Sequence, residues 1–185
     1  MAPHRARPRP GVRRRRADGR AARHRRRSGN RRDLTRLYLD DLAPVLEDAE
    51  ARGVKLALEN IMTPLSRSAA LADIIDRVGH RHLGACLDTG HANVNETTLG
   101  AIDTLGPRIL TTHLHDNHGG DDEHLLPGEG TLDWTLIADA LAKLPSKPHL
   151  MLELRWPQAG DAPDEQIFRA RVRQARERLR DIFGA

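Results

Sequence analysis

Short apolar segments alternate with amphipathic segments from residue 33 to residue 183, and this alternation leaves few folds open to the chain. A short apolar run is typical of a buried strand, whereas apolar residues spaced three and four apart indicate a helix. We expect strands at 54–58, 83–87, 109–115 and 149–152. Strands that alternate with helices in this way form successive βαβ units, so the sequence predicts an α/β fold with a parallel sheet.

Helix signals fill the intervals between these strands. Residues 33–51 and 134–144 place apolar side chains at helical spacing. Ser66 or Ser68 is expected to cap a further helix, and Asn95 is expected to cap the next one. A polar loop is expected at 116–130.

A last helix is expected to start with Pro163 in its first turn. It carries an apolar stripe and, beside it, a set of arginines that we interpret as a solvated face. The apolar stripe consists of Ile167, Val172, Ala175, Leu179 and Ile182, and the arginines are Arg169, Arg171, Arg173, Arg176, Arg178 and Arg180.

The first 32 residues differ in composition from the rest. They hold 14 of the 30 basic residues and one of the 26 acidic residues, which leaves 16 basic and 25 acidic residues in 33–185, a net charge of −9. A segment with so few large apolar side chains cannot offset its ordering entropy, so we expect an Arg-rich disordered tail at 1–32 and a folded domain at 33–185. Three interpretations of the tail remain: a segment that binds nucleic acid or an anionic surface, a localisation signal, or sequence from a wrong start or a shifted frame.

Charge and composition exclude several classes of function. A net charge of −9 in the body argues against nucleic acid as its partner, because a phosphate backbone attracts basic surfaces. Cys86 is the single cysteine, which rules out an internal disulfide. No apolar run approaches the roughly 18 residues of a membrane span. We therefore expect a cytoplasmic protein without a membrane partner.

Each expected strand delivers a metal-binding type of side chain at or near its carboxyl end. These residues are Glu59, Asp88, His113 and Glu153. Because the carboxyl ends of parallel strands meet at one edge, we expect the four side chains to lie together. Three carboxylates and one imidazole form an oxygen-rich set, which favours one divalent ion such as Mn²⁺, Mg²⁺ or Co²⁺, with Zn²⁺ as a further option.

Several of these residues also have a purely structural interpretation. Asp88 can form a turn into a helix through its own side chain. His113 and His115 lie two apart on a strand and share a face, which suits a site or a polar edge strand. His124 lies in a charged loop, where a solvated side chain is the default, and Cys86 is most simply a small core residue.

Five short motifs in order resemble the sugar phosphate isomerase/epimerase family, whose fold is the xylose isomerase-like TIM barrel. The similarity covers roughly residues 33–183. The motifs are 53–60 (GVKLALEN), 87–91 (LDTGH), 113–117 (HLHDN), 126–134 (LPGEGTLDW) and 152–153 (LE).

The resemblance implies roles for single residues. In this family the residues that match Glu59, Asp88, His113 and Glu153 hold one divalent metal, and the two glutamates also act as the acid/base pair. The histidine that matches His91 contacts substrate. The remaining substrate-site candidates are the loop residues His115, Asp116 and His124.

The chain departs from this family in its number of strands. A whole barrel has eight strands and about 250 residues, whereas we expect four strands here, similar to strands five to eight. The expected fold is therefore an incomplete TIM barrel. Its open edges favour pairing with another half, so a homo-oligomer is one expected outcome.

The resemblance implies an isomerase or epimerase that moves a proton next to a carbonyl through a metal-stabilised enediolate. The expected substrate is a keto sugar, a sugar phosphate or a polyol-derived compound. Two alternatives remain open. Asp122 and His124 resemble the D-x-H ligands of AP-site endonucleases, metal-dependent hydrolases on the same barrel. The chain could also be a non-catalytic fragment of either enzyme.

Overall fold

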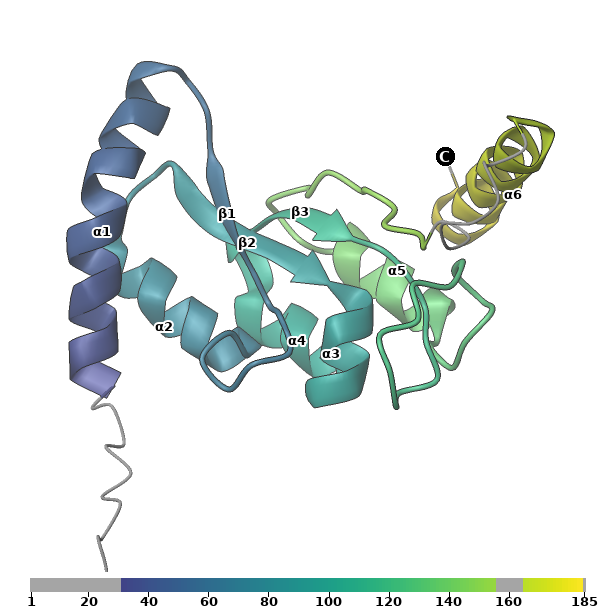
Figure 1. The fold of residues 1–185 in the computed structure, drawn as a ribbon, viewed down its shortest axis with the longest axis horizontal. Helices are drawn as coiled ribbons and strands as arrows, with labels where there is room; N and C mark the ends of the chain where they lie inside the picture. Colours follow the sequence, from purple (N-terminus) through teal and green to yellow (C-terminus); the bar gives the residue numbers. More distant parts are fainter. Residues whose placement is uncertain (1–30, 156–164, 185) are drawn as a thin grey trace, which may run out of the picture.

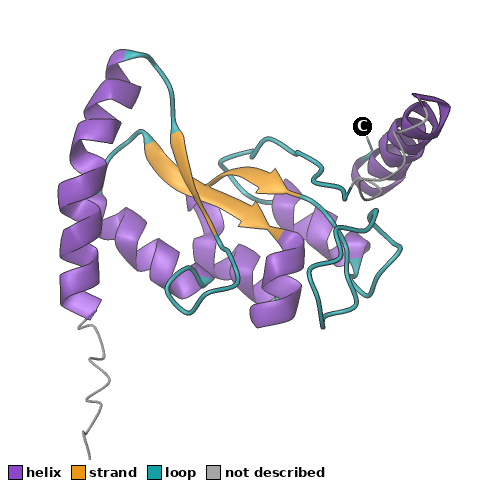
Figure 2. Cartoon of the chain, viewed as in Figure 1, coloured by secondary structure: helices purple, strands orange, loops and turns teal. Residues whose placement is uncertain are grey.

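A computed structural model describes residues 31–155 and 165–184, with side chains from residue 40 onward (Figures 1 and 2). The helices are α1 (Arg31–Ala51), α2 (Ser68–Val78), α3 (Thr89–Asn95), α4 (Thr98–Leu105), the 3-10 helix η1 (Gly106–Arg108), α5 (Trp134–Ala142) and α6 (Glu165–Phe183). The strands are β1 (Leu56–Glu59), β2 (Leu83–Asp88) and β3 (Ile109–His113). Helix α1 begins two residues before the expected boundary at 33, and Pro163 lies outside the described residues.

The three strands form one parallel sheet in the order β1-β2-β3, which confirms the predicted α/β fold. Leu56 pairs with Leu83 at the start of the sheet, and Asp88 pairs with His113 at its end. Each parallel connection runs through helices that lie on the same side of the sheet (Figure 1). The order and direction of the strands therefore bring their carboxyl ends to one edge.

The fourth expected strand, 149–152, is not a continuous strand. Its residues run parallel to β3 through two separate bridges, Thr111–His149 and Leu114–Leu152. Backbone hydrogen bonds join it to β3, among them Leu114 N to Met151 O at 2.7 Å. Nothing in the described part of the chain pairs with its outer side, and Leu150 and Met151 stay 42% and 46% exposed. The pairing is therefore interrupted between the two bridges, and the segment lies beside β3 without forming a regular ladder.

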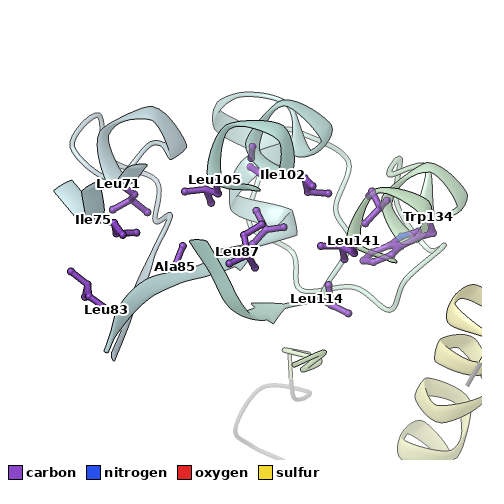
Figure 3. Packing of buried hydrophobic residues seen from close by; sticks show 14 of the residues in the cluster. Leu71, Ile75, Leu83, Ala85, Leu87, Ile102, Leu105, Leu114, Trp134 and Leu141 are labelled. Atoms are coloured by element: carbon purple, nitrogen blue, oxygen red, sulfur yellow. The ribbon is translucent and has the colours of Figure 1, made fainter. Parts of the chain in front are cut away.

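The alternation of side chains along β2 separates the core from the opposite face of the sheet. Leu83, Ala85 and Leu87 point toward the helices and belong to the main apolar cluster (Figure 3). Cys86 and Asp88 point to the other face because successive side chains of a strand alternate. The helix-covered face is thus the core, and the opposite face, which a closed barrel would enclose, carries the polar strand ends.

Two predicted helix caps are wrong. Helix α2 begins after Arg67, which makes no side-chain cap, and the backbone N–H and hydroxyl of Ser68 donate instead to Glu96 at 3.1 and 2.7 Å. Ser66 bonds back to the loop before α2. The cap of α4 is Thr97, which accepts from Gly100 N, whereas Asn95 ends α3. Local sequence could not identify Glu96, since it lies 28 residues from the helix it caps.

The last helix is less buried than its sequence predicts. Ala175 is buried, and Leu179 and Ile182 pack against the core, but Ile167 and Val172 remain 58% and 49% exposed. Together with Leu152 and Leu154, the exposed residues line an apolar groove of about 770 Å³. Arg171 is not simply solvated, because it binds both carboxylate oxygens of Glu129 at 3.0 Å.

The sheet does not close on itself in the part of the chain that the structure describes. Strand β1 forms one edge and the 149–153 segment forms the other. Among the described helices, none combines the length and the apolar character needed to cross a bilayer.

Candidate metal centre

The four residues at the strand ends lie together. Each of Glu59, Asp88, His113 and Glu153 offers one ligand atom, and these atoms all fall within 4.8 Å of one another. Glu59, Asp88 and His113 are the last residues of β1, β2 and β3, and Glu153 follows the segment that pairs with β3. The parallel topology is thus what gathers the group.

The side chain of His113 lies at the centre of this group. Its Nδ1 atom is 2.6 Å from Glu153 Oε2, 3.5 Å from Glu59 Oε1 and 3.9 Å from Asp88 Oδ2. Both His113 Nδ1 and Glu153 Oε2 are buried without a hydrogen bond of acceptable geometry. Buried polar atoms are normally satisfied. Convergence of unsatisfied nitrogen and oxygen atoms on one point therefore fits a divalent cation.

Asp88 is the fully buried member of the group. The backbone of Asp88 is held by the side-chain amide of Asn60, which donates to Asp88 O at 2.9 Å and accepts from Asp88 N at 2.7 Å. Its Oδ1 atom accepts from His91 N at 2.7 Å and so caps α3. Asp88 therefore does both: it caps α3, as the turn expected from the sequence would, and it belongs to the ligand group.

His91 lies between this group and a second one. Its Nδ1 atom is 3.3 Å from Glu59 Oε1 and 3.5 Å from Asp88 Oδ2, and its Nε2 atom is 3.4 Å from Asp122 Oδ2. The neighbouring Glu59 carboxylate raises the pKa of His91 to about 9. In turn, His91 holds the pKa of Glu59 below its ordinary value.

The second group consists of His91, His115, Asp122 and His124, whose ligand atoms also lie within 4.8 Å of one another. The carboxylate of Asp122 lies close to three histidines. Its Oδ2 atom is 2.9 Å from His124 Nε2 and 3.4 Å from His91 Nε2, and its Oδ1 atom is 3.6 Å from His115 Nε2. The loop at 116–130 thus returns His124 to the strand ends, where its side chain is only 17% exposed. Sequence reasoning missed Asp122 among the residues expected at the sugar site, although the D-x-H spacing had marked it.

Two further candidates of the loop motif are fully buried. The Nε2 atom of His115 lies 3.0 Å from Asp88 Oδ1, and although burial lowers the pKa of His115, this carboxylate leaves it raised overall. Asp116 accepts from four donors: the backbone N–H groups of Asn117, Gly128 and Leu132 and the indole of Trp134. Asp116 belongs to neither ligand group, and its carboxylate lies inside the 116–134 loop.

Cys86 faces the same side of β2 as Asp88, away from the main apolar cluster, and is buried there. It is 4% exposed, and burial, followed by the charges of the nearby carboxylates, raises the pKa of its thiol to about 12. The thiol therefore remains protonated at neutral pH.

Comparison with known proteins connects this arrangement to one family. The family profile described as "Xylose isomerase-like TIM barrel" matches residues 16–181, most of the chain. A D-psicose 3-epimerase of Enterocloster bolteae is 32% identical over 117 residues, which make up 61% of this chain and 37% of that protein. The chain therefore spans little more than a third of the length of this relative.

Solved structures show the same fold. A D-psicose 3-epimerase from Clostridium cellulolyticum H10, solved with D-tagatose, superposes with a TM-score of 0.71 at 21% identity, covering 83% of this chain and 58% of that one. A protein named IOLI, whose crystal structure holds a zinc atom, superposes with a TM-score of 0.66 at 19% identity, covering 83% of this chain and 58% of that one. At these identities the likeness shows the fold alone.

Proposed function

Because the chain belongs to the xylose isomerase-like TIM barrel family, we propose that it carries the metal-binding part of a sugar or sugar phosphate isomerase or epimerase. The observation that carries the proposal is the convergence of Glu59, Asp88, His113 and Glu153 at the carboxyl ends of parallel strands. Relatives named D-psicose 3-epimerase support the reaction type and a keto sugar as the class of substrate.

One divalent ion would be held by these four residues. The oxygen-rich donor set of these residues supports Mn²⁺, Mg²⁺ or Co²⁺. The zinc atom in the structure of the protein named IOLI supports Zn²⁺. A bound ion would supply Lewis acidity, which polarises a substrate carbonyl and makes the neighbouring C–H more acidic.

Glu59 and Glu153 are the proposed acid/base pair. Their side chains are 30% and 42% exposed, so they remain accessible to a substrate, whereas Asp88 is fully buried. One glutamate removes the proton next to the carbonyl to give an enediolate, and a proton then returns to the substrate. Return to the neighbouring carbon gives isomerisation, and return to the same carbon from the opposite face by the other glutamate gives epimerisation.

His91 and His124 are the proposed substrate contacts. Both have exposed surface, at 12% and 17% of their side chains, and both lie beside the ligand group. Their imidazoles can orient substrate oxygens by hydrogen bonding.

Metal binding is tested by calorimetric titration of the 185-residue chain with Mn²⁺. We expect one high-affinity ion, and a large loss of affinity in Asp88→Ala and His113→Ala. The exposed His118 supplies a matched control, since His118→Ala removes an imidazole from the same loop without touching the group. Unchanged binding in Asp88→Ala and His113→Ala would contradict the site.

Proton transfer is tested by solvent deuterium incorporation into keto sugars, followed by NMR. We expect slow exchange from this chain, because substrate positioning supplies on the order of 7–11 kcal/mol in favourable cases and the described sheet encloses only one side of the site. Adding the first half of a related barrel should raise turnover by orders of magnitude. In that protein, Glu59→Gln or Glu153→Gln should abolish exchange, and full exchange in either variant would contradict the two-glutamate mechanism. Metal binding without exchange in the completed barrel would instead support a non-catalytic fragment.

A second candidate function is metal-dependent hydrolysis of a phosphodiester at an AP site. The observation in its favour is the second group, in which Asp122 and His124 meet His91. The net charge of −9 over residues 33–185 counts against a nucleic-acid substrate. Nicking of a duplex with one abasic site, lost in Asp122→Ala, would favour the hydrolase, and exchange in a keto sugar without nicking would exclude it.

A further inference from the structure

His115 is the buried histidine next to the ligand group, and it has no exposed surface through which to contact a substrate. We propose that His115 is a positioning residue that fixes the carboxylate of Asp88 for metal binding. This inference rests on the proposed metal site and adds a residue to it.

The contact between the two side chains is close and fully enclosed. The Nε2 atom of His115 lies 3.0 Å from Oδ1 and 3.2 Å from Oδ2 of Asp88, and both residues are 0% exposed. Oδ1 also accepts the backbone N–H of His91 at 2.7 Å. Donors on two sides leave the carboxylate little freedom to rotate, so Oδ2 remains directed toward His113 Nδ1, 3.9 Å away.

The backbone of His115 is held by the residue that follows Asp88 in sequence. The hydroxyl of Thr89 donates to His115 O at 2.8 Å and accepts from His115 N at 3.1 Å. These two bonds connect the end of β2 to the chain just beyond β3. They fix the height of His115 relative to Asp88 along the strand direction.

The ring of His115 is held from two further sides. It stacks on His124 with the ring centroids 4.0 Å apart and the planes 10° from parallel. On the other side it fills the space next to Gly90. A methyl group added at Gly90 would overlap the imidazole, whose atoms are the three nearest to it. The segment 88–91 therefore supplies a ligand, a backbone clamp and room for the ring.

Such a contact is expected to govern metal affinity. A hydrogen-bonded partner fixes the orientation of a ligand before the ion arrives, and loss of such a partner typically weakens metal binding 10–100-fold. A residue that only fills space would make no such difference once a group of similar volume replaced it.

The test is Mn²⁺ affinity of the full chain by calorimetry, together with the visible spectrum of the Co²⁺-loaded protein. His115→Phe keeps the ring volume but removes the donor, and we expect 10–100-fold weaker Mn²⁺ binding and an altered Co²⁺ spectrum. His115→Gln places an amide nitrogen near the same position, and we expect it to recover most of the affinity. His118→Phe, on the exposed part of the loop, should bind as the wild type does.

Gly90→Ala provides a second variant that leaves His115 itself intact. The added methyl group displaces the ring, so Mn²⁺ affinity should fall as in His115→Phe. Gly120→Ala is its control, because a methyl group there meets no atom within 4 Å. This pair keeps the inference testable if His115→Phe does not fold.

Wild-type affinity in His115→Phe and Gly90→Ala would overturn the inference and leave the metal site standing, as would a His115→Gln variant no better than His115→Phe. A wild-type chain that binds no Mn²⁺ would overturn the metal site, and the role of His115 with it. The two failures are therefore distinguishable.

Discussion

At the scale of single residues, Asp88 shows how one side chain can meet a structural and a chemical need together. One oxygen caps α3 while the other faces His113. The capping bond places the first turn of α3 and so brings His91 over the site. A substitution at Asp88 is therefore expected to alter both the helix start and the ligand group, which is why metal-binding tests also need variants at His113.

His91 makes the stability of the metal-free protein depend on pH. Its pKa is raised to about 9 by Glu59, so its contribution is fully present below its unfolded pKa of about 6.5 and is lost as pH rises through about 9. We expect the free energy of unfolding of the wild type to exceed that of His91→Gln by up to about 3 kcal/mol at pH 6. Urea unfolding at several pH values should show the difference shrinking toward pH 9.

The partner of His91 provides the control for this prediction. Glu59→Gln removes the largest of the interactions that raise the pKa of His91 and leaves those of Asp88 and Asp122, so the loss of stability between pH 6.5 and pH 9 should be smaller in that variant. A difference between the wild type and His91→Gln that stays constant over this range would contradict the ion pair.

Asp116 is predicted to stabilise the 116–134 loop. Asp116→Ala leaves four donors without their acceptor, two of them buried and two partly buried, and the penalty for a buried unsatisfied group is about 1–3 kcal/mol. We expect a loss of at least about 3 kcal/mol in the free energy of unfolding, measured by urea denaturation. Asp139→Ala on the exposed side of α5 should change it little. A similar effect of both substitutions would argue against the anchoring role.

At the scale of elements, one helix start is capped by a neighbouring residue and another by a residue far away in the sequence. Helix α4 begins at a local cap, Thr97, whereas α2 is capped by Glu96 from the end of α3. The turn between α3 and α4 thus holds two helices at once. This arrangement fixes α2 and α4 against each other on the covered face of the sheet.

The cap of α4 can be tested by comparing Thr97, the cap in the structure, with Asn95, the cap expected from the sequence. Thr97→Ala removes the acceptor for Gly100 N and should cost about 1 kcal/mol of stability. Asn95→Ala should not uncap α4, because Asn95 ends the preceding helix. Thermal unfolding of the two variants separates these outcomes, and a larger effect of Asn95→Ala would restore the sequence-based assignment.

At the scale of the whole molecule, the sheet has two open edges. Apolar side chains remain exposed along both, including Val54 and Ile61 beside β1 and Leu150 and Met151 at the outer segment. Exposed edges and apolar patches favour association. Further strands from another chain would cover them.

Association of the 185-residue chain is therefore predicted to depend on concentration. Sedimentation velocity should show larger species as concentration rises, and Leu150→Lys should reduce them by placing a charge on the outer edge. Thr104→Lys, at an exposed position of α4, is the matched control. A single monomeric species at all concentrations would contradict this prediction.

The sequence by itself determined the parallel α/β fold and the identity of the four strand-end residues. It could do so because strand and helix periodicities are local properties of the chain, and because parallel strands necessarily present their carboxyl ends together. For the same reason the sequence alone groups Glu59, Asp88, His113 and Glu153.

Only the tertiary structure decided which of the remaining polar residues join a ligand group and which are structural. It joined Asp122 and His124 to His91, turned Asp116 into the loop, and set His115 behind Asp88. It also showed that 149–152 bonds along one side only. These outcomes depend on contacts between residues that lie up to 39 positions apart. Local patterns record which backbone shape a segment prefers, but not which side chains meet once the segments pack.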